Sequence, residues 1–310
     1  MKVLSFTNMY PNHKLPYFGV FVKNQVDALN KIDGLTVDVL NVVTKKAGGS
    51  HVNYFRVFVN LIYIRVFGNY DIVHCHHAYC FFLAKLLFFR CIVYTCHEGE
   101  YFRRNFIEEI KLNAIKSCDY CIFVSELMYQ EINKSKKIFL PCSVDLSYFP
   151  SVIDKKKSRE ELGFTIDEKI IFFPADPQRK EKRFYILKEA FTKLGNEFRI
   201  ITGGDIEYQD MHKWYSASDL VISCSEYESD GMIYKESILC NRFFISPNVG
   251  NAKYYSKFGG MIVEDFNSNT LADEISLFFE YKPRKKSGVM KFLDINVESK
   301  LIFEIYKEVL

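Results

Sequence analysis

Short apolar runs alternate with segments of helical periodicity along most of the chain, and this alternation limits the possible folds more than any other feature. In the first half the strand-like runs lie at residues 3–6, 37–42, 72–75, 92–95, 120–124 and 138–140. The helical segments between them lie at 20–29, 54–66, 81–88, 106–115 and 127–132. Because strands that are apolar on both faces belong in parallel sheets covered by helices, this half predicts a doubly wound α/β domain.

A connector with a proline at each end, PCSVDLSYFP at residues 141–150, interrupts the alternation. Afterwards it resumes, with strands expected at 170–173, 198–202, 220–223 and 243–246 and helices at 185–194, 209–216, 232–239 and 270–279. The chain has 310 residues, enough for two domains of about 150 each. We therefore predict a Rossmann-like domain at 1–145 and a second Rossmann-like domain at 146–295. Residues 296–310 form a terminal helix that can pack back toward the first domain. Parallel sheets bind ligands beyond the carboxyl ends of their strands, so the two sheets are expected to face an interdomain cleft.

Composition excludes several other classes of protein. A net charge of +3 is too small to demand a nucleic-acid partner. Nine cysteines without regular spacing indicate buried free thiols in a reducing cytosol rather than a disulfide framework. The opening MKVLSFTNMY lacks the features of a signal peptide, and no apolar run approaches the ~20 residues of a membrane span. A cytoplasmic protein is expected.

The sharpest candidate site is the segment ESDGMIYKE, which starts at Glu228 and follows the strand expected at 220–223. Gly231 opens the next helix, where free backbone N–H groups attract phosphate and a glycine permits close approach. Glu228 in the loop and Glu236 inside the helix can each accept hydrogen bonds from sugar hydroxyls. Both glutamates are equally explained as solvated charges near a helix start, where acidic residues are favoured.

A second candidate, DPQRKEKR, begins at Asp176 just after the strand expected at 170–173. An arginine and a lysine a few residues apart on a strand-to-helix loop can bind an anionic group such as a phosphate. Arg179 and Lys182 suit that role, with Lys180 as a rival, and an ordinary solvated turn is the alternative. Gly203 and Gly204, after the strand expected at 198–202, allow either a plain tight turn or a close backbone approach to ligand. The residues that follow them, 205–208, are a candidate lining for a nucleobase pocket.

The sequence around these sites resembles the family 4 glycosyltransferases, which have the GT-B fold. Their hallmark is a pair of glutamates separated by seven residues, as Glu228 and Glu236 are. Further segments in the family's order are NMYPNHKLPYFGVFV (8–22), DIVHCHH (71–77), HEG (97–99), LPCSVDLSYF (140–149) and the ending IYKEVL.

The resemblance implies roles for individual residues. Glu228 matches the glutamate that contacts the donor sugar, and Glu236 the one that holds the ribose hydroxyls. The backbone amides of Gly231 and Met232 would meet the sugar and diphosphate, and Arg179 and Lys182 would hold the diphosphate. The domain at 1–145 would be the acceptor side, and within it Gly19 would approach the donor phosphates and His97 would contact the donor sugar. Family members commonly have Gly or Pro after the first glutamate where this chain has Ser229 and Asp230, which leaves the donor sugar open.

The implied activity is retaining transfer of a hexose-type sugar from a nucleotide-sugar donor, with a UDP-sugar as the first choice. The expected acceptor is a saccharide or lipid-linked saccharide in surface-glycan biosynthesis, and no cofactor or metal is expected. A catalytically silent relative that only binds a glycan or nucleotide is the alternative. A nicotinamide-dependent dehydrogenase would need G-x-G-x-x-G after the first strand, where the chain instead has NMYPN from Asn8.

Two other motifs suggest different kinds of site, one for a metal and one for a membrane surface. His74, Cys75, His76, His77 and Cys80 invite a zinc interpretation, but their spacing lacks the second ligand pair of a zinc site. The aromatic segment 54–67, with two arginines, predicts either a helix in a membrane interface or a buried helix whose arginines reach solvent. Peripheral contact with the inner face of a membrane therefore stays open.

Overall fold

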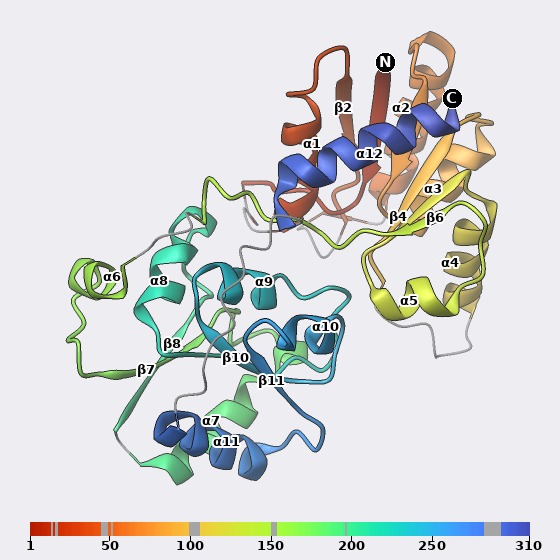
Figure 1. The fold of residues 1–310 in the computed structure, drawn as a ribbon. Coiled ribbons are helices and arrows are strands. Elements are labelled where there is room, and N and C mark those ends of the chain that lie inside the picture. Colours follow the sequence, from red (N-terminus) through yellow and green to blue (C-terminus); the bar gives the residue numbers. More distant parts are fainter. Residues whose placement is uncertain are drawn as a thin grey trace. The chain divides into compact units, whose positions relative to one another are not determined.

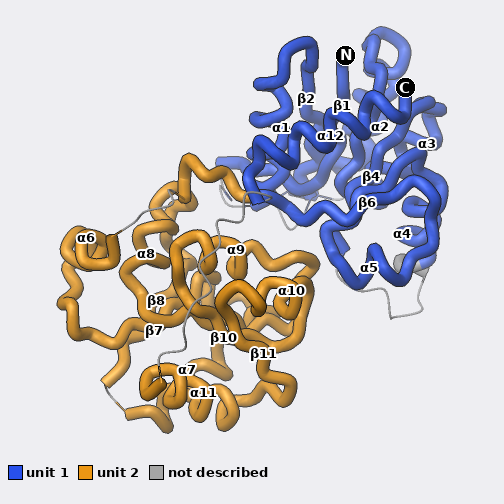
Figure 2. The backbone as a smooth tube through the Cα atoms, viewed as in Figure 1, with its two compact units in different colours: residues 1–143, 292–310 blue, residues 144–291 orange. Residues whose placement is uncertain are grey.

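In a computed structural model, the chain forms two compact units, Met1–Ser143 with Phe292–Leu310 and Val144–Lys291 (Figure 2). The structure describes residues 1–13, 15, 18–44, 49–50, 52–98, 106–149, 154–195, 197–281 and 293–310. Parts of several expected segments lie outside the described residues, including Pro16, Tyr17, Gly99 and Pro150. Each unit is an α/β domain built on one parallel sheet.

The first unit has a six-stranded sheet in the order β2-β1-β3-β4-β5-β6, with every neighbouring pair parallel (Figure 1). Its strands are β1 (Lys2–Thr7), β2 (Thr36–Asn41), β3 (Ile72–Cys75), β4 (Ile92–Cys96), β5 (Tyr120–Phe123) and β6 (Lys137–Phe139). The connecting helices are α1 (Val20–Leu29), α2 (Val52–Phe67), α3 (Ala78–Leu86), α4 (Phe106–Ser117) and α5 (Glu126–Glu131).

Alternate residues along these strands enter two separate cores, one on each face of the sheet. Leu4 and Phe6 pack in a core with residues of α2, α3 and α4. Val3, from the same strand, packs on the other face with α1 and the last helix, α12 (Ile295–Val309). The chain's end therefore returns to the first unit, where α12 lies against α1 (Figure 1).

The second unit has a five-stranded parallel sheet in the order β11-β10-β9-β7-β8. The strands are β7 (Lys169–Phe173), β8 (Phe198–Thr202), β9 (Leu220–Ile222), β10 (Phe243–Pro247) and β11 (Gly260–Val263). The helices are α6 (Lys155–Glu161), α7 (Phe184–Leu194), α8 (Met211–Ala217), α9 (Met232–Leu239), α10 (Ala252–Ser256) and α11 (Ser268–Tyr281), with short 3-10 turns η2 (Lys180–Lys182) and η3 (Tyr208–Asp210). The predicted fold class, two doubly wound Rossmann-like domains, is confirmed.

Three elements of the second unit were not expected from the sequence: α6, α10 and β11. Helix α6 reads KKKSREE and has no apolar stripe; it starts at Asp154, whose side chain accepts a hydrogen bond from the Lys156 N–H. Helix α10 has only five residues, and β11 begins with a glycine. Short or polar elements of this kind carry too little hydrophobic periodicity to be recognised.

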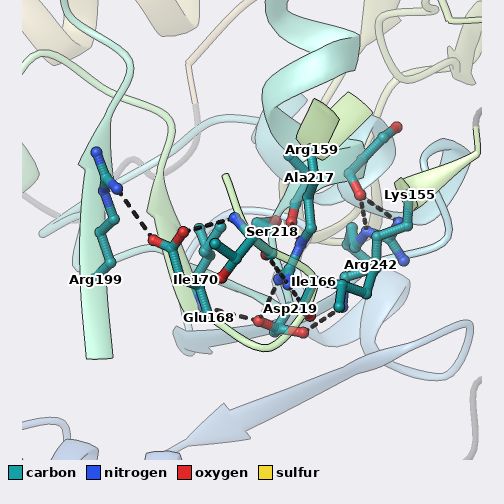
Figure 3. Close-up of polar contacts among 12 residues, drawn as sticks. Lys155, Arg159, Ile166, Glu168, Ile170, Arg199, Ala217, Ser218, Asp219 and Arg242 are labelled. Carbon is teal, nitrogen blue, oxygen red and sulfur yellow. Dashed lines mark hydrogen bonds and ion pairs between the residues drawn. The ribbon is translucent and has the colours of Figure 1, made fainter. Parts of the chain in front are cut away.

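A polar network joins the amino ends of the central strands β7 and β9 (Figure 3). Arg159 of α6 has a side chain that is 1% exposed, and it donates to the carbonyl of Ala217 at 2.8 Å and to Asp219 at 2.9 Å. Asp219 also accepts from the backbone N–H of Ile170 at 2.8 Å and pairs with Lys155. These contacts fix α6 and α8 to the sheet and are structural.

Candidate functional site

The loops that carry the candidate residues of the second unit leave the carboxyl ends of adjacent strands. Strand β7 lies between β8 and β9, so the chain order reverses at β7. Parallel α/β sheets bind ligands at such a reversal, because the loops on either side diverge and leave room. The loop after β7 carries Arg179 and Lys182, and the loop after β9 carries Glu228.

Lys182 and Glu228 are brought into direct contact at this point. The Lys182 Nζ lies 2.5 Å from Oε1 of Glu228, and their side chains are only 15% and 16% exposed. The hydroxyl of Ser225 donates to the same carboxylate oxygen at 2.7 Å. A cation and a carboxylate that are 46 residues apart in the sequence thus meet where the strand order reverses.

Arg183 ties the two loops to each other. It has a left-handed backbone, with φ of 47°, at the start of α7. Its guanidinium donates to the carbonyls of Cys224 at 2.7 Å and Ser225 at 3.0 Å. A backbone bond from Glu226 to Glu181 at 2.9 Å adds to this link. Sequence analysis did not select Arg183, because nothing local distinguishes it from the neighbouring cations.

Arg179 pairs with Glu181 of its own loop in this structure. Its guanidinium bonds the carboxylate of Glu181 at 2.7 and 2.9 Å, and its side chain is 46% exposed. The rival Lys180 lies in η2 beside it. Of the cations selected from the sequence, Lys182 is therefore the one whose bond to Glu228 the structure shows.

Gly231 forms the amino end of α9 and has a left-handed backbone with φ of 82°. A Cβ atom there would lie 2.2 Å from the ring of Tyr234, so both conformation and space require glycine. Met232, the first residue of α9, is partly exposed. The first N–H groups of a helix lack intrahelical partners, so this end can donate to an anion.

A buried cluster, missed from the sequence, supports this helix start. Asp230 is 3% exposed and accepts from the side-chain amide of Asn251 at 2.7 Å and from the hydroxyl of Tyr255 at 3.1 Å. Lys235, fully buried, pairs with the same carboxylate. Gly250 lies against Glu228, since a Cβ on it would be 2.9 Å from that residue's Cβ. The cluster fixes the loop between Glu228 and α9.

Glu236 is 5% exposed and accepts a hydrogen bond from the hydroxyl of Tyr215 at 2.7 Å. Burial raises the pKa of Glu236 to about 7, against the lowering effects of Tyr215 and Lys235. Burial and the charge of Glu236 raise the pKa of Tyr208, whose hydroxyl is buried and has no hydrogen-bond partner in the described part of the chain. A polar ligand that reached this corner would find one acceptor and one unsatisfied hydroxyl.

Gly203 and Gly204 bring the turn after β8 against the loop after β7. A Cβ on Gly203 would lie 2.7 Å from the carbonyl carbon of Pro174, and one on Gly204 would lie 3.1 Å from the Cα of Asp176. This tight packing explains the glycine pair. The close approach here is to protein backbone.

Gly19 belongs to the first unit, at the amino end of α1. Its φ is 72°, and a Cβ would lie 2.3 Å from the backbone carbonyl carbon of Met9, so no other residue fits without rearrangement. In that sheet the chain order reverses at β1, which lies between β2 and β3. Gly19 ends the loop after β1, and therefore borders the reversal point of the first sheet.

His97, just after β4, has protein partners for both ring nitrogens. Its Nε2 lies 3.2 Å from Nδ1 of His76, and its Nδ1 lies 3.9 Å from the sulfur of Cys142. Burial, and next the neighbouring His76, hold the pKa of His97 well below its ordinary value, so the ring is neutral. Because Nε2 of His76 is buried without a partner in the described structure, the shared proton is best placed on Nδ1 of His76. A ligand can hydrogen-bond the His97 ring only if one of these two contacts is broken, and the contact with the sulfur of Cys142 is the weaker.

The zinc interpretation finds no support in the described ranges, where no group of three His, Cys, Asp or Glu could hold a metal. His74 instead bonds Tyr306 of α12 and Thr95, at 2.7 Å each. None of the helices in the part of the chain that the structure describes is both long and apolar enough to cross a bilayer.

The fold of the chain is similar to that of several proteins of known structure. The chain is similar to sucrose-phosphate synthase from Thermosynechococcus elongatus, with 15% identity, 99% of each chain covered and a TM-score of 0.77. It is also similar to a glycosyltransferase from Rickettsia africae, with 20% identity, coverage of 99% and 98% and a TM-score of 0.74. The Anabaena protein HepE, solved with UDP and glucose, matches at 15% identity, 99% coverage of each chain and a TM-score of 0.70. The two parallel-sheet units are thus those of the GT-B fold.

A family model matches part of the sequence. Residues 20–148, nearly all in the first unit, match the model for Glycosyltransferase Family 4. No curated protein matches the chain. This match agrees with the resemblance to family 4 glycosyltransferases that the sequence motifs indicate.

Proposed function

We propose that the chain transfers a hexose-type sugar, with retention of configuration, from a nucleotide-diphosphate donor to a saccharide or lipid-linked saccharide acceptor. The observation that carries this proposal is the contact of Lys182 with Glu228 where the order of the second sheet reverses. It provides a cation for a diphosphate beside a carboxylate for sugar hydroxyls. A UDP-sugar is the first choice of donor, and structures of HepE with UDP-glucose and of Staphylococcus aureus MnaA with UDP support it by analogy of fold.

In the proposed reaction the leaving diphosphate is neutralised by Lys182, by Arg179 once it leaves Glu181, and by the amino end of α9. These groups would do the work that a divalent metal does elsewhere, by stabilising the charge of the departing diphosphate. Glu228 positions the sugar by accepting from its hydroxyls, and the departing diphosphate assists deprotonation of the incoming acceptor hydroxyl on the same face. Glu236 accepts from the ribose hydroxyls, while Gly19 and His97 contact the donor phosphates and sugar. The proposed setting is surface-glycan biosynthesis at the cytoplasmic face of a membrane.

The test begins with the donor. UDP-, GDP- and ADP-sugars are screened for thermal stabilisation, since a ligand at 100 times its Kd adds about 2.7 kcal/mol. Release of the free nucleoside diphosphate is then measured with candidate acceptors. We expect Glu228→Ala and Arg179→Ala to abolish turnover with the fold intact, because each removes a group that acts on the transferred sugar or the diphosphate.

Arg199→Ala is the matched control for Arg179→Ala. Arg199 is also an exposed arginine paired with a glutamate, Glu168 at 3.0 Å, but it lies away from the strand ends that carry the site. Wild-type rates in Glu228→Ala or Arg179→Ala with the true donor would refute the assignment. Donor binding without diphosphate release under any acceptor would instead favour a catalytically silent binding protein.

A further inference from the structure

Helix α2 exposes most of its apolar side chains, and only two of its residues are buried. Val57 and Leu61 attach the helix to the core. The large apolar residues that remain exposed are Val52, Phe55, Val59, Ile62, Tyr63, Val66 and Phe67, with exposed fractions between 40% and 69%. Surface helices of globular proteins normally put charged and polar residues on the outer face. An outer face of this composition indicates a surface that is covered in use.

The end of α3 continues the same surface. Arg65 of α2 donates to the carbonyl of Leu87 at 3.1 Å, and its guanidinium lies 5.7 Å from the ring centre of Phe89. This contact places the exposed Leu86 and Phe88 beside the carboxyl end of α2. We call α2 together with residues 86–88 the apolar face.

Phe88 has a backbone conformation that phenylalanine rarely adopts. Its φ is 56°, and its N–H bonds the carbonyl of Lys85 while that of Phe89 bonds Ala84. This is the helix-ending arrangement in which glycine normally occupies the left-handed position. Phe88 is nevertheless 80% exposed. Within the described part of the chain, neither the backbone conformation nor packing explains an aromatic ring at this position, which indicates contact with a ligand outside the chain.

The charged side chains of α2 and of residues 85–90 are all positive. Arg56, Lys85 and Arg90 are exposed, and Arg65 lies among them. Between residues 52 and 90 the only acidic side chain is Asp71. Its carboxylate accepts from the backbone N–H of Lys2 at 2.7 Å, so it is engaged at the edge of β1. The apolar face therefore combines exposed aromatic rings with positive charge from its own segments.

We propose that the apolar face docks on an anionic lipid surface, with α2 lying in the interface and Phe88 inserted among the acyl chains. Aromatic and aliphatic side chains flanked by arginine and lysine fit the boundary between headgroups and hydrocarbon. A second copy of this chain fits less well, because a symmetric contact would bring cations against cations with hardly any carboxylate to pair with them. The proposal does not depend on the transferase chemistry.

The test is flotation of the full-length protein with vesicles of phosphatidylcholine, with and without 30% phosphatidylglycerol. We expect binding to the anionic vesicles. Phe88→Gly should weaken it about tenfold, because a buried aromatic ring contributes strongly. Since glycine relieves the strained backbone, this variant should unfold at the same temperature as the wild type or higher, so loss of binding cannot be ascribed to misfolding. Arg56→Gln with Lys85→Gln should lower the preference for anionic lipid by about fivefold per cation.

Tyr281→Ser is the matched control, because Tyr281 is 70% exposed on the second unit and should not affect flotation. The proposal is overturned if the wild type does not float with anionic vesicles, or if Phe88→Gly floats like the wild type. It is also overturned if Phe88→Gly instead abolishes a concentration-dependent dimer, which would assign the face to a second copy. Nucleoside diphosphate release with a soluble acceptor should be unchanged in Phe88→Gly, which separates this test from that of the proposed function.

Discussion

The buried carboxyl of Glu236 predicts how donor affinity changes with pH. Burial raises its pKa to about 7, so near neutrality it is distributed between the protonated and ionised forms. Under the proposed function it accepts hydrogen bonds from two ribose hydroxyls, which favours the ionised form because a protonated carboxyl must also place its own O–H. Donor affinity should therefore rise with pH and level off above about 7.

The size of the effect follows from the pKa. With a pKa of about 7, roughly a tenth of the carboxyl is ionised at pH 6 and roughly nine-tenths at pH 8. Kd should fall about tenfold over this interval, equivalent to about 1.4 kcal/mol. The suitable ligand is UDP-glucose, whose diphosphate is esterified at both ends and does not titrate in this range. Calorimetry at pH 6, 7 and 8 gives Kd, and buffers of different ionisation enthalpy at pH 7 should reveal release of about half a proton.

Glu236→Gln is the control, because an amide does not titrate; its Kd should be weaker at pH 8 and independent of pH. The effect on folding has the opposite sign. A pKa raised above the ordinary 4.5 means that the folded state holds the proton more tightly, so this carboxyl lowers the free energy of unfolding as pH rises from about 4.5 through 7. A Kd for UDP-glucose that is constant between pH 6 and 8, or that improves as pH falls, would refute the reasoning.

Two further predictions concern stability, each with a control inside the chain. Gly231→Ala should lower the free energy of unfolding by more than Gly34→Ala. Both glycines have a left-handed backbone, where alanine costs about 1–2 kcal/mol, but only a Cβ at Gly231 would also meet another side chain, the ring of Tyr234. Equal losses in urea unfolding would contradict the packing at α9. Arg159→Ala should cost about 3–5 kcal/mol, because it removes a buried guanidinium that bonds both Asp219 and the carbonyl of Ala217. Lys156→Ala, from an exposed pair on the same helix, should cost almost nothing. If denaturation midpoints shift equally, the network is not structural.

Much of the fold could be predicted because its strands are buried on both faces and carry the signal themselves. The expected bounds of α1, α9 and β8 agree with the structure to the residue. Helix α6 could not be found in this way, because its attachment depends on one buried arginine and a distant aspartate rather than on an apolar stripe. Contacts between residues far apart in sequence decide such elements.

The candidate site divides in the same way. That Lys182 and Glu228 lie at the same end of the sheet follows from its parallel topology. Which cation of the loop faces inward does not, because the turn η2 and the left-handed Arg183 determine the direction of each side chain. The environment of Glu236 also depends on Tyr215, a residue from a different helix that no local pattern connects to it.

Under the proposed function, the pair of Lys182 and Glu228 couples recognition of the diphosphate to recognition of the sugar. Removing two charges from water is costly, and a pair of this kind adds little net stability, so its placement at the strand ends is better explained by a ligand than by folding. Under the proposed function the diphosphate competes with Glu228 for the ammonium of Lys182. Glu228 then retains the hydroxyl of Ser225 and gains a free position for a sugar hydroxyl. Binding of the diphosphate thereby prepares the carboxylate for the sugar, which couples recognition of the two halves of one donor.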